Sequence, residues 1–102
     1  MSGTDLSWLW RVLAERRSAD PEESYTARLL AAGPDRVAQK VGEEAVETVI
    51  AAMRVASGED DGRHQLVGEA ADLVYHLLVL LLASGVSLED VTAELEKRHR
   101  KS

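Results

Sequence analysis

The sequence contains no cysteine among its 102 residues. Disulfide bonds, thiolate zinc sites and cysteine nucleophiles are therefore excluded, and the composition suits a reducing cytoplasm. Positive charge is also scarce, because 12 Lys and Arg residues are outnumbered by 18 Asp and Glu residues, for a formal net charge of −6. This balance argues against nucleic acid and anionic membrane as partners, since both require clustered basic residues.

Long apolar runs are missing as well. The longest uninterrupted run, residues 77–83, is far shorter than the ~20 residues that a membrane span needs. The N-terminus has no basic segment followed by an apolar one, as a targeting signal would. We therefore expect a cytoplasmic protein with no membrane and no nucleic-acid partner.

Proline and aromatic residues are few, with two Pro, two Trp, two Tyr and no Phe. Apolar residues recur mostly at helical spacing, which predicts an all-α chain of one domain, residues 1–102. Glycine, proline and capping residues divide it into a bundle of four to five helices. The expected helices cover about 6–17, 24–32, 34–57, 63–84 and 87–99.

The helix expected over 63–84 is apolar around most of its circumference, more than a single core-facing stripe requires. Such a helix is buried on several sides. In so short a chain a second copy is the simplest cover, so we predict a homodimer.

Two acidic stripes carry the chemistry. Lys40, Glu43, Glu44 and Glu47 recur at three- and four-residue spacing on one expected helix, and Glu69, Asp72 and His76 repeat this spacing on the next. Glu47 and Asp72 lie at equal distances from the turn that joins the helices, about 15 Å at ~1.5 Å per residue. The stripes are therefore level with each other, and inward rotation would gather up to five carboxylates.

Oxygen ligands without cysteine or a histidine pair favour Mg²⁺, with Mn²⁺ as a substitute, over zinc. Such an ion neutralises phosphate charge and activates a bound water for in-line attack, and five carboxylates suffice for more than one ion. The alternative is a solvated helix face, which is common for glutamates at this spacing. Glu69 and Asp72 favour the metal site, because they interrupt an otherwise apolar helix.

These residues also carry a resemblance. Residues 43–47 (EEAVE) and 69–72 (EAAD) resemble the EExxE and ExxD signatures of the all-α nucleoside triphosphate pyrophosphohydrolases, the MazG-like superfamily. The words SYTA at 24–27, QKVGEE at 39–44, YHLLVLL at 75–81 and KRH at 97–99 narrow the similarity to the phosphoribosyl-ATP pyrophosphohydrolase family. The resemblance covers roughly residues 6–99.

The resemblance implies a MazG-like helical bundle that forms an intertwined homodimer. It also implies a Mg²⁺-dependent reaction of histidine biosynthesis, in which water cleaves phosphoribosyl-ATP between its α and β phosphates to give phosphoribosyl-AMP and pyrophosphate. Glu44, Glu47, Glu69 and Asp72 match the carboxylates that bind the principal magnesium ion. Glu43 matches the one nearer a second metal or the attacking water, so Glu43, Glu44 and Glu47 are the catalytic candidates.

The remaining candidates concern substrate binding, and each has a structural alternative. Lys40 is expected to pair either with a phosphate or with the glutamate stripe, and His76 either contacts substrate or a ligand carboxylate or is a structural residue. Ser24, Tyr25 and Arg28 belong to a short helix that could close over the nucleotide, though Tyr25 could instead pack and Arg28 be solvated. Arg98 and His99 could reach a phosphate, although the helix dipole alone favours basic residues there.

Some members of this family are fused to phosphoribosyl-AMP cyclohydrolase, a zinc enzyme that needs cysteine ligands. With no cysteine and no room for that domain, the chain is expected to pass its product to a separate cyclohydrolase. Two other functions remain open. One is a housecleaning nucleoside triphosphate pyrophosphohydrolase of the same superfamily, and the other is a non-catalytic helical dimerisation module with a solvated acidic surface.

Overall fold

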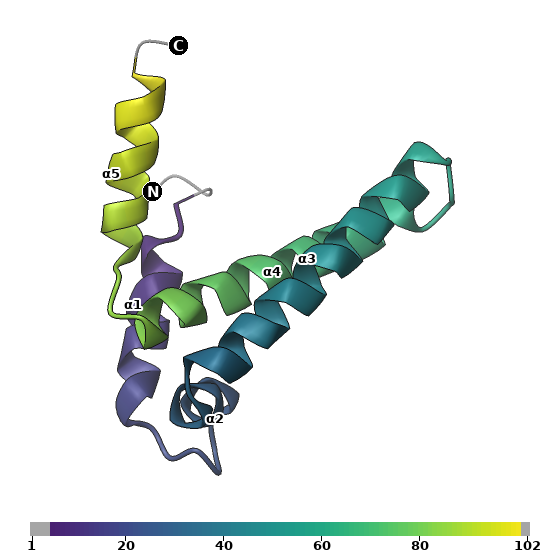
Figure 1. The fold of residues 1–102 in the computed structure, drawn as a ribbon. Helices are drawn as coiled ribbons and strands as arrows, with labels where there is room; N and C mark the ends of the chain where they lie inside the picture. The colour runs from purple at the N-terminus through teal and green to yellow at the C-terminus, as the bar shows by residue number, and fades with distance from the viewer. Residues whose placement is uncertain (1–4, 101–102) are drawn as a thin grey trace.

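The computed structural model describes residues 5–100, which form five α-helices and one 3₁₀ turn (Figure 1). The elements in chain order are α1 (Ser7–Glu15), the 3₁₀ turn η1 (Arg16–Ser18), α2 (Tyr25–Ala32), α3 (Pro34–Ala56), α4 (Gly62–Ala83) and α5 (Leu88–His99). No strand occurs among the described residues. The predicted all-α class is confirmed.

Local signals in the sequence set the helix boundaries. The Ser24 hydroxyl caps α2 by accepting a hydrogen bond from the Ala27 backbone N–H. Gly33, with φ of 100°, separates α2 from α3, and Pro34 starts α3, where its missing N–H has no cost. Ser87 and Asp90 form the predicted capping box of α5.

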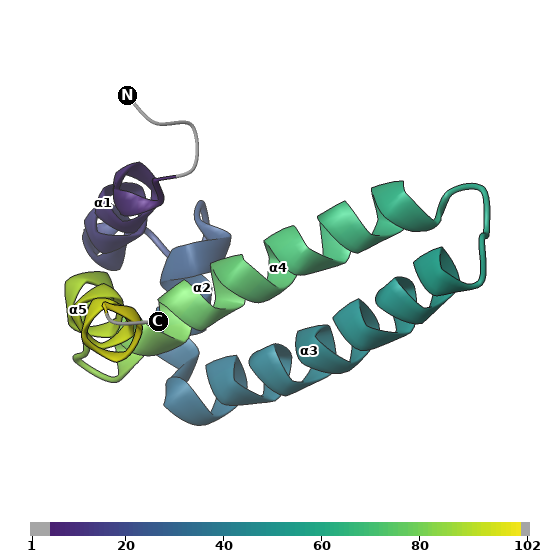
Figure 2. The same cartoon turned by 90° about the horizontal axis from the view of Figure 1, so that it is seen from above.

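The two longest helices, α3 and α4, lie antiparallel along most of their length (Figure 2). The turn between them is tight, and Gly62 at its end is buried. A Cβ atom at Gly62 would lie 3.1 Å from the backbone nitrogen of Val55, so a side chain there would press on the end of α3. The hairpin predicted from residues 58–62 is present.

The hydrophobic core lies at one end of the hairpin, where α1 and α2 pack against the C-terminal half of α4 and the start of α3. Its buried members are Leu13, Leu29, Val37, Leu78, Val79 and Leu82. Beyond this core the molecule opens into a V, with the rest of the hairpin as one arm and α5 as the other (Figure 1). None of the residues in α5 is buried.

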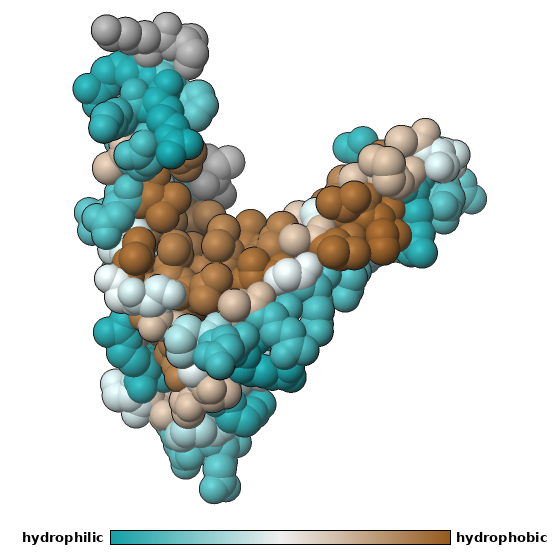
Figure 3. Space-filling view, in the orientation of Figure 1, coloured by the Kyte–Doolittle hydropathy of each residue, from teal (hydrophilic) through white to brown (hydrophobic). Residues whose placement is uncertain are grey.

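Several large apolar side chains remain exposed to solvent. They gather in the inner angle of the V and on the hairpin arm (Figure 3). On α3 they form one stripe, the α3 apolar stripe, which consists of Val46, Val49, Ile50 and Met53, between 46% and 61% exposed. On α4, Val67 is 68% exposed and Leu77 is 42% exposed. A single chain therefore leaves apolar surface uncovered on both helices, including part of α4, the helix that the sequence predicts to be buried on several sides.

Of the helices described, α4 alone is long and apolar enough to cross a membrane, judged by length and composition only. Its most apolar window has a mean hydropathy of 1.8, and 22% of that window is buried. The core helix of a soluble protein can meet the same criterion. The acidic residues Glu69 and Asp72 lie inside this helix, and charged groups are costly at the centre of a membrane.

Candidate active site

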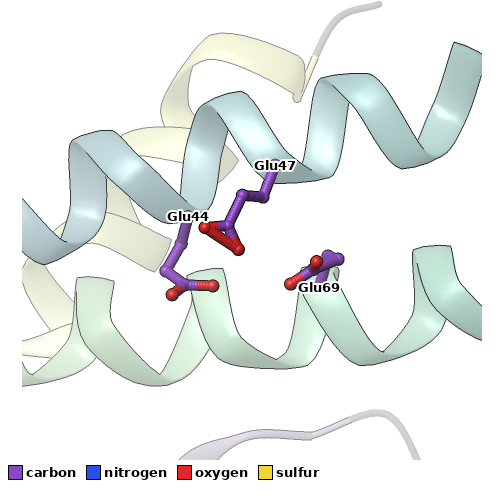
Figure 4. Close-up of side chains that lie close together, drawn as sticks. All are labelled: Glu44, Glu47 and Glu69. Carbon is purple, nitrogen blue, oxygen red and sulfur yellow. The ribbon is translucent and has the colours of Figure 1, made fainter.

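Three carboxylates meet in the space between α3 and α4 (Figure 4). Glu44 and Glu47 extend from α3, and Glu69 approaches them from α4. One carboxylate oxygen of each lies within 4.8 Å of the other two. The two predicted acidic stripes therefore face each other, and this trio has the spacing of a metal-binding group.

Glu44 is the most buried of the three, at 8% exposure. Its Oε2 atom is buried and has no hydrogen-bond partner. Burial, together with repulsion from Glu47, Asp72 and Glu69, raises the pKa of the Glu44 carboxyl, while His76 opposes this rise. A buried carboxylate oxygen without a partner, among other carboxylates, is a site that a cation would stabilise.

Asp72 lies at the edge of this group. Its side chain is exposed, and it lines with Glu47 and Glu69 a cleft of about 500 Å³ that runs along the hairpin. Asp72 also repels Glu44 electrostatically, so its negative charge acts on the trio. Three of the five predicted metal ligands thus form the trio, and a fourth, Asp72, lines the cleft beside it.

Glu43 lies outside the trio. Its carboxylate accepts a hydrogen bond from Gln39 Nε2 at 3.2 Å, and the Lys40 ammonium is 3.7 Å away. Adjacent residues are about 100° apart around a helix, so Glu43 and Glu44 cannot face α4 equally. The ion pair anticipated as an alternative for Lys40 is present.

Thr48 links the two acidic helices at the level of the trio. Its hydroxyl lies 2.7 Å from the Glu44 carbonyl oxygen on its own helix and 3.2 Å from the Glu69 carbonyl oxygen on α4. A hydroxyl proton shared between these carbonyls fixes Glu44 and Glu69 relative to each other. The sequence interpretation did not include Thr48, although it lies four residues after Glu44 and so shares its face.

His76 is buried and connects α4 to α2. Its Nδ1 atom lies 2.8 Å from the Asp72 carbonyl oxygen, and its Nε2 atom lies 3.2 Å from the Tyr25 hydroxyl. Because a carbonyl oxygen only accepts, Nδ1 carries a proton, and in the neutral ring Nε2 accepts from Tyr25. His76 therefore has structural partners on both nitrogens, and it also interacts electrostatically with Glu44.

The other substrate-binding candidates on α2 lie beside this contact. Tyr25 is 45% exposed and stacks on Tyr75, whose hydroxyl is hydrogen-bonded to Thr26. The Arg28 guanidinium lies 5.7 Å from the centre of the Tyr25 ring and donates to the Pro21 carbonyl oxygen. The structure thus brings Tyr25, Arg28 and His76 together, while Ser24 acts as the α2 cap.

Arg98 and His99 lie on the other arm of the V. Arg98 donates to Glu94 at 2.9 Å, and His99 Nδ1 lies 2.8 Å from the Leu95 carbonyl oxygen. Both contacts are within α5, which does not approach the acidic trio in this chain (Figure 1). The structure does not bring these two residues to the site within one protomer.

Comparison with known proteins shows the family of the chain. A family model described as phosphoribosyl-ATP pyrophosphohydrolase matches residues 6–99. The chain belongs to the phosphoribosyl-ATP pyrophosphohydrolase family. The predicted family is confirmed, and with it the assignment to a class of hydrolases.

Similar proteins extend over nearly the whole chain. Phosphoribosyl-ATP pyrophosphatase of Methylobacterium nodulans is 51% identical over 102 residues, which are 100% of this chain and 90% of that protein. The protein of the same name from Erythrobacter litoralis is 57% identical over 93 residues, 91% of this chain and 84% of the relative. Histidine biosynthesis bifunctional protein HisIE of Escherichia coli is 55% identical over 92 residues, 90% of this chain and 42% of the relative.

Within this pyrophosphohydrolase family member, the cleft beside the trio includes residues that the sequence interpretation missed. Arg54, His64 and Gln65 line it toward the tip of the hairpin, and Arg54 donates to Gln65 at 3.3 Å. Arg54 follows Glu47 by seven residues, and Gln65 precedes Glu69 by four. Extending both acidic stripes toward the turn would have found them.

Proposed function

We propose that this chain hydrolyses phosphoribosyl-ATP between its α and β phosphates, giving phosphoribosyl-AMP and pyrophosphate in histidine biosynthesis. The observation that carries this proposal is the meeting of Glu44, Glu47 and Glu69 in a chain of the phosphoribosyl-ATP pyrophosphohydrolase family. The names of the relatives supply the substrate and the pathway.

The carboxylates fit a magnesium ion. The donors are oxygen atoms only, and the partnerless Oε2 of Glu44 offers a buried ligand atom. Glu44, Glu47, Glu69 and Asp72 would hold the ion, and Mn²⁺ would be accepted as a substitute. When bound, the metal neutralises phosphate charge and lowers the pKa of a coordinated water.

The chain's own residues supply position and charge. Thr48 holds the backbones of Glu44 and Glu69 together, and the hydrogen bond from His76 to the Asp72 carbonyl fixes the turn of α4 that carries the fourth ligand. Glu43 and Lys40 lie next to this set and are paired with each other. Their proposed roles, near the attacking water and a phosphate, require that this partly exposed pair separate when substrate binds.

We also propose that the protein is a cytoplasmic homodimer that passes its product to a separate cyclohydrolase. The α3 apolar stripe is exposed in one chain, and its member Ile50 lines the cleft beside the acidic trio. With Val67 and Leu77 the stripe offers apolar surface that a second copy would cover. In such a dimer, α5 of one protomer could bring Arg98 and His99 to the site of the other.

The test compares pyrophosphate release from phosphoribosyl-ATP, dUTP, dCTP and ATP by the same enzyme preparation with Mg²⁺. We expect the highest kcat/KM for phosphoribosyl-ATP. A preference for a simple triphosphate would instead assign the chain to the housecleaning enzymes of the superfamily. No Mg²⁺-dependent release from any substrate would favour the non-catalytic module.

A further inference from the structure

A second, smaller cleft lies between α2 and the first turns of α3. It has a volume of about 240 Å³ and is lined by Tyr25, Arg28, Leu29, Ala32 and Arg36. This lining includes two arginines, and no acidic residue is among its described members, in a chain whose formal net charge is −6. The cleft is therefore a local concentration of positive charge.

Both arginines have N–H groups that make no hydrogen bond to other described residues. The Arg36 side chain is exposed and forms no hydrogen bond or ion pair with any residue from 5 to 100. Arg28 uses Nη1 to hold the Pro21 carbonyl at 2.8 Å, and its other N–H groups have no partner of this kind. A pair of guanidinium groups is well matched to a phosphate, which each can bind through two hydrogen bonds.

The cleft is connected to the acidic site through Tyr25. Tyr25 lines the cleft, and its hydroxyl contacts His76, which is hydrogen-bonded in turn to the Asp72 carbonyl. Along α3, Arg36 precedes Glu44 by eight residues, a rise of about 12 Å. At about 240 Å³ the cleft is also smaller than the ~300–1,000 Å³ of pockets that enclose a whole ligand, so it fits one end of a larger molecule.

The proposed substrate has two phosphate-bearing ends. Its triphosphate is cleaved, and a monophosphate lies at the far end of the phosphoribosyl group, separated by a ribose, a purine and a second ribose. A simple nucleoside triphosphate has only the first of these ends. We infer that Arg36, with Arg28, binds the terminal monophosphate and thereby distinguishes phosphoribosyl-ATP from ordinary nucleotides. This inference rests on the proposed function.

The test crosses one enzyme variant with one substrate change. Wild type and Arg36→Gln are assayed for pyrophosphate release from phosphoribosyl-ATP and from synthetic ribosyl-ATP, which lacks only the terminal monophosphate. For phosphoribosyl-ATP, we expect Arg36→Gln to lower kcat/KM by about ten- to hundredfold, mainly through KM, as for loss of a charged hydrogen-bond pair. For ribosyl-ATP, we expect wild type and variant to be equal.

Arg63→Gln is the matched control, since Arg63 is an exposed arginine at the opposite end of the hairpin and is expected to leave both substrates unaffected. Equal losses of kcat/KM for both substrates in Arg36→Gln, or none for either, would overturn the inference while wild-type turnover upholds the proposed function. Wild-type enzyme that releases no pyrophosphate from either substrate would overturn both.

Discussion

Glu44 is the residue on which the site depends most directly. It is buried among carboxylates that repel it, and its Oε2 atom has no hydrogen-bond partner among the described residues. This arrangement costs stability when no cation is bound, because a buried charge without a partner is unfavourable. The cost is consistent with a side chain held ready for a metal ion.

Removing one carboxylate from the set separates stability from activity. We expect Glu47→Gln and Asp72→Asn to lose more than about a hundredfold in turnover. Loss of a residue that only orients a metal ligand costs about 10- to 100-fold, and loss of the ligand itself should cost more. In EDTA the same variants should melt at a higher temperature than wild type, because a repulsive charge is gone. Glu15→Gln, an exposed carboxylate at the end of α1, should change neither value. Unchanged turnover in both site variants would exclude them as essential ligands.

The raised pKa of Glu44 predicts a pH dependence of the metal-free protein. The pKa of this carboxyl in the folded chain is above its ordinary value of 4.5, so between these values the folded state binds more protons than the unfolded state. Its contribution to stability therefore falls as pH rises through this interval. Glu44→Gln lacks this loss.

Urea unfolding of wild type and Glu44→Gln in EDTA measures the effect. The two free energies of unfolding should converge at acid pH, where Glu44 is protonated, and the advantage of the variant should grow as pH rises through the raised pKa. A difference that is the same at every pH would show that Glu44 is not the titrating group.

At the scale of elements, the α3–α4 hairpin brings the acidic residues together. Equal distances from the turn predicted that Glu47 and Asp72 lie level, and both line the same cleft. The α4 carboxylate that is grouped with Glu44 and Glu47, however, is that of Glu69, which precedes Asp72 by three residues. The spacing did not predict which glutamates face inward, because a stripe of Glu43, Glu44 and Glu47 spans more of the helix than one contact face holds. Packing made that choice, turning Glu44 toward α4 and leaving Glu43 with Lys40.

Thr48 is expected to keep the two acidic helices in register. In Thr48→Val, loss of the shared hydroxyl proton should lower the free energy of unfolding by roughly 0.5–1.5 kcal/mol. It should also raise the Mg²⁺ concentration needed for half-maximal activity. Thr92→Val is the control, since that hydroxyl makes a similar bond to the Glu89 carbonyl within α5, away from the site. Equal Mg²⁺ requirements in the two variants would contradict a positioning role for Thr48.

The hairpin turn depends on the absence of a side chain at Gly62. Gly62→Ala should destabilise the fold by about 1–3 kcal/mol, as overpacking does, because its Cβ would meet the backbone of Val55 at 3.1 Å. Gly42→Ala, in the same hairpin with nothing within 4 Å, should instead stabilise it by about 0.5–1 kcal/mol. Thermal unfolding of both variants tests the contrast, and equal shifts would mean that the turn tolerates a side chain.

At the scale of the whole molecule, the single chain leaves apolar side chains exposed to solvent. The sequence predicted a second copy from the apolar circumference of α4, and the structure adds the α3 apolar stripe, which the sequence interpretation did not single out. The composition could not place α5, whose residues are all at least partly exposed and whose basic end lies far from the trio. Contacts between copies are not encoded in the helical spacing of one chain.

Sedimentation equilibrium tests the predicted dimer. Wild type should approach twice the mass of one chain as concentration rises, because association removes exposed apolar surface from water. Val49→Lys, in the middle of the α3 apolar stripe, should shift the equilibrium toward monomer, whereas Ala38→Lys, exposed on α3 outside the stripe, should not. A monomer mass at every concentration would rule out the dimer.

The most direct test of the central claim follows the phosphorus-31 resonances of phosphoribosyl-ATP during hydrolysis, with wild type and Asp72→Asn. With Mg²⁺, wild type should produce pyrophosphate and phosphoribosyl-AMP in equal amounts, and the reaction should stop with EDTA and be lost in the variant. Orthophosphate as the first product, or an equal rate in Asp72→Asn, would contradict a carboxylate-held magnesium site for pyrophosphohydrolysis.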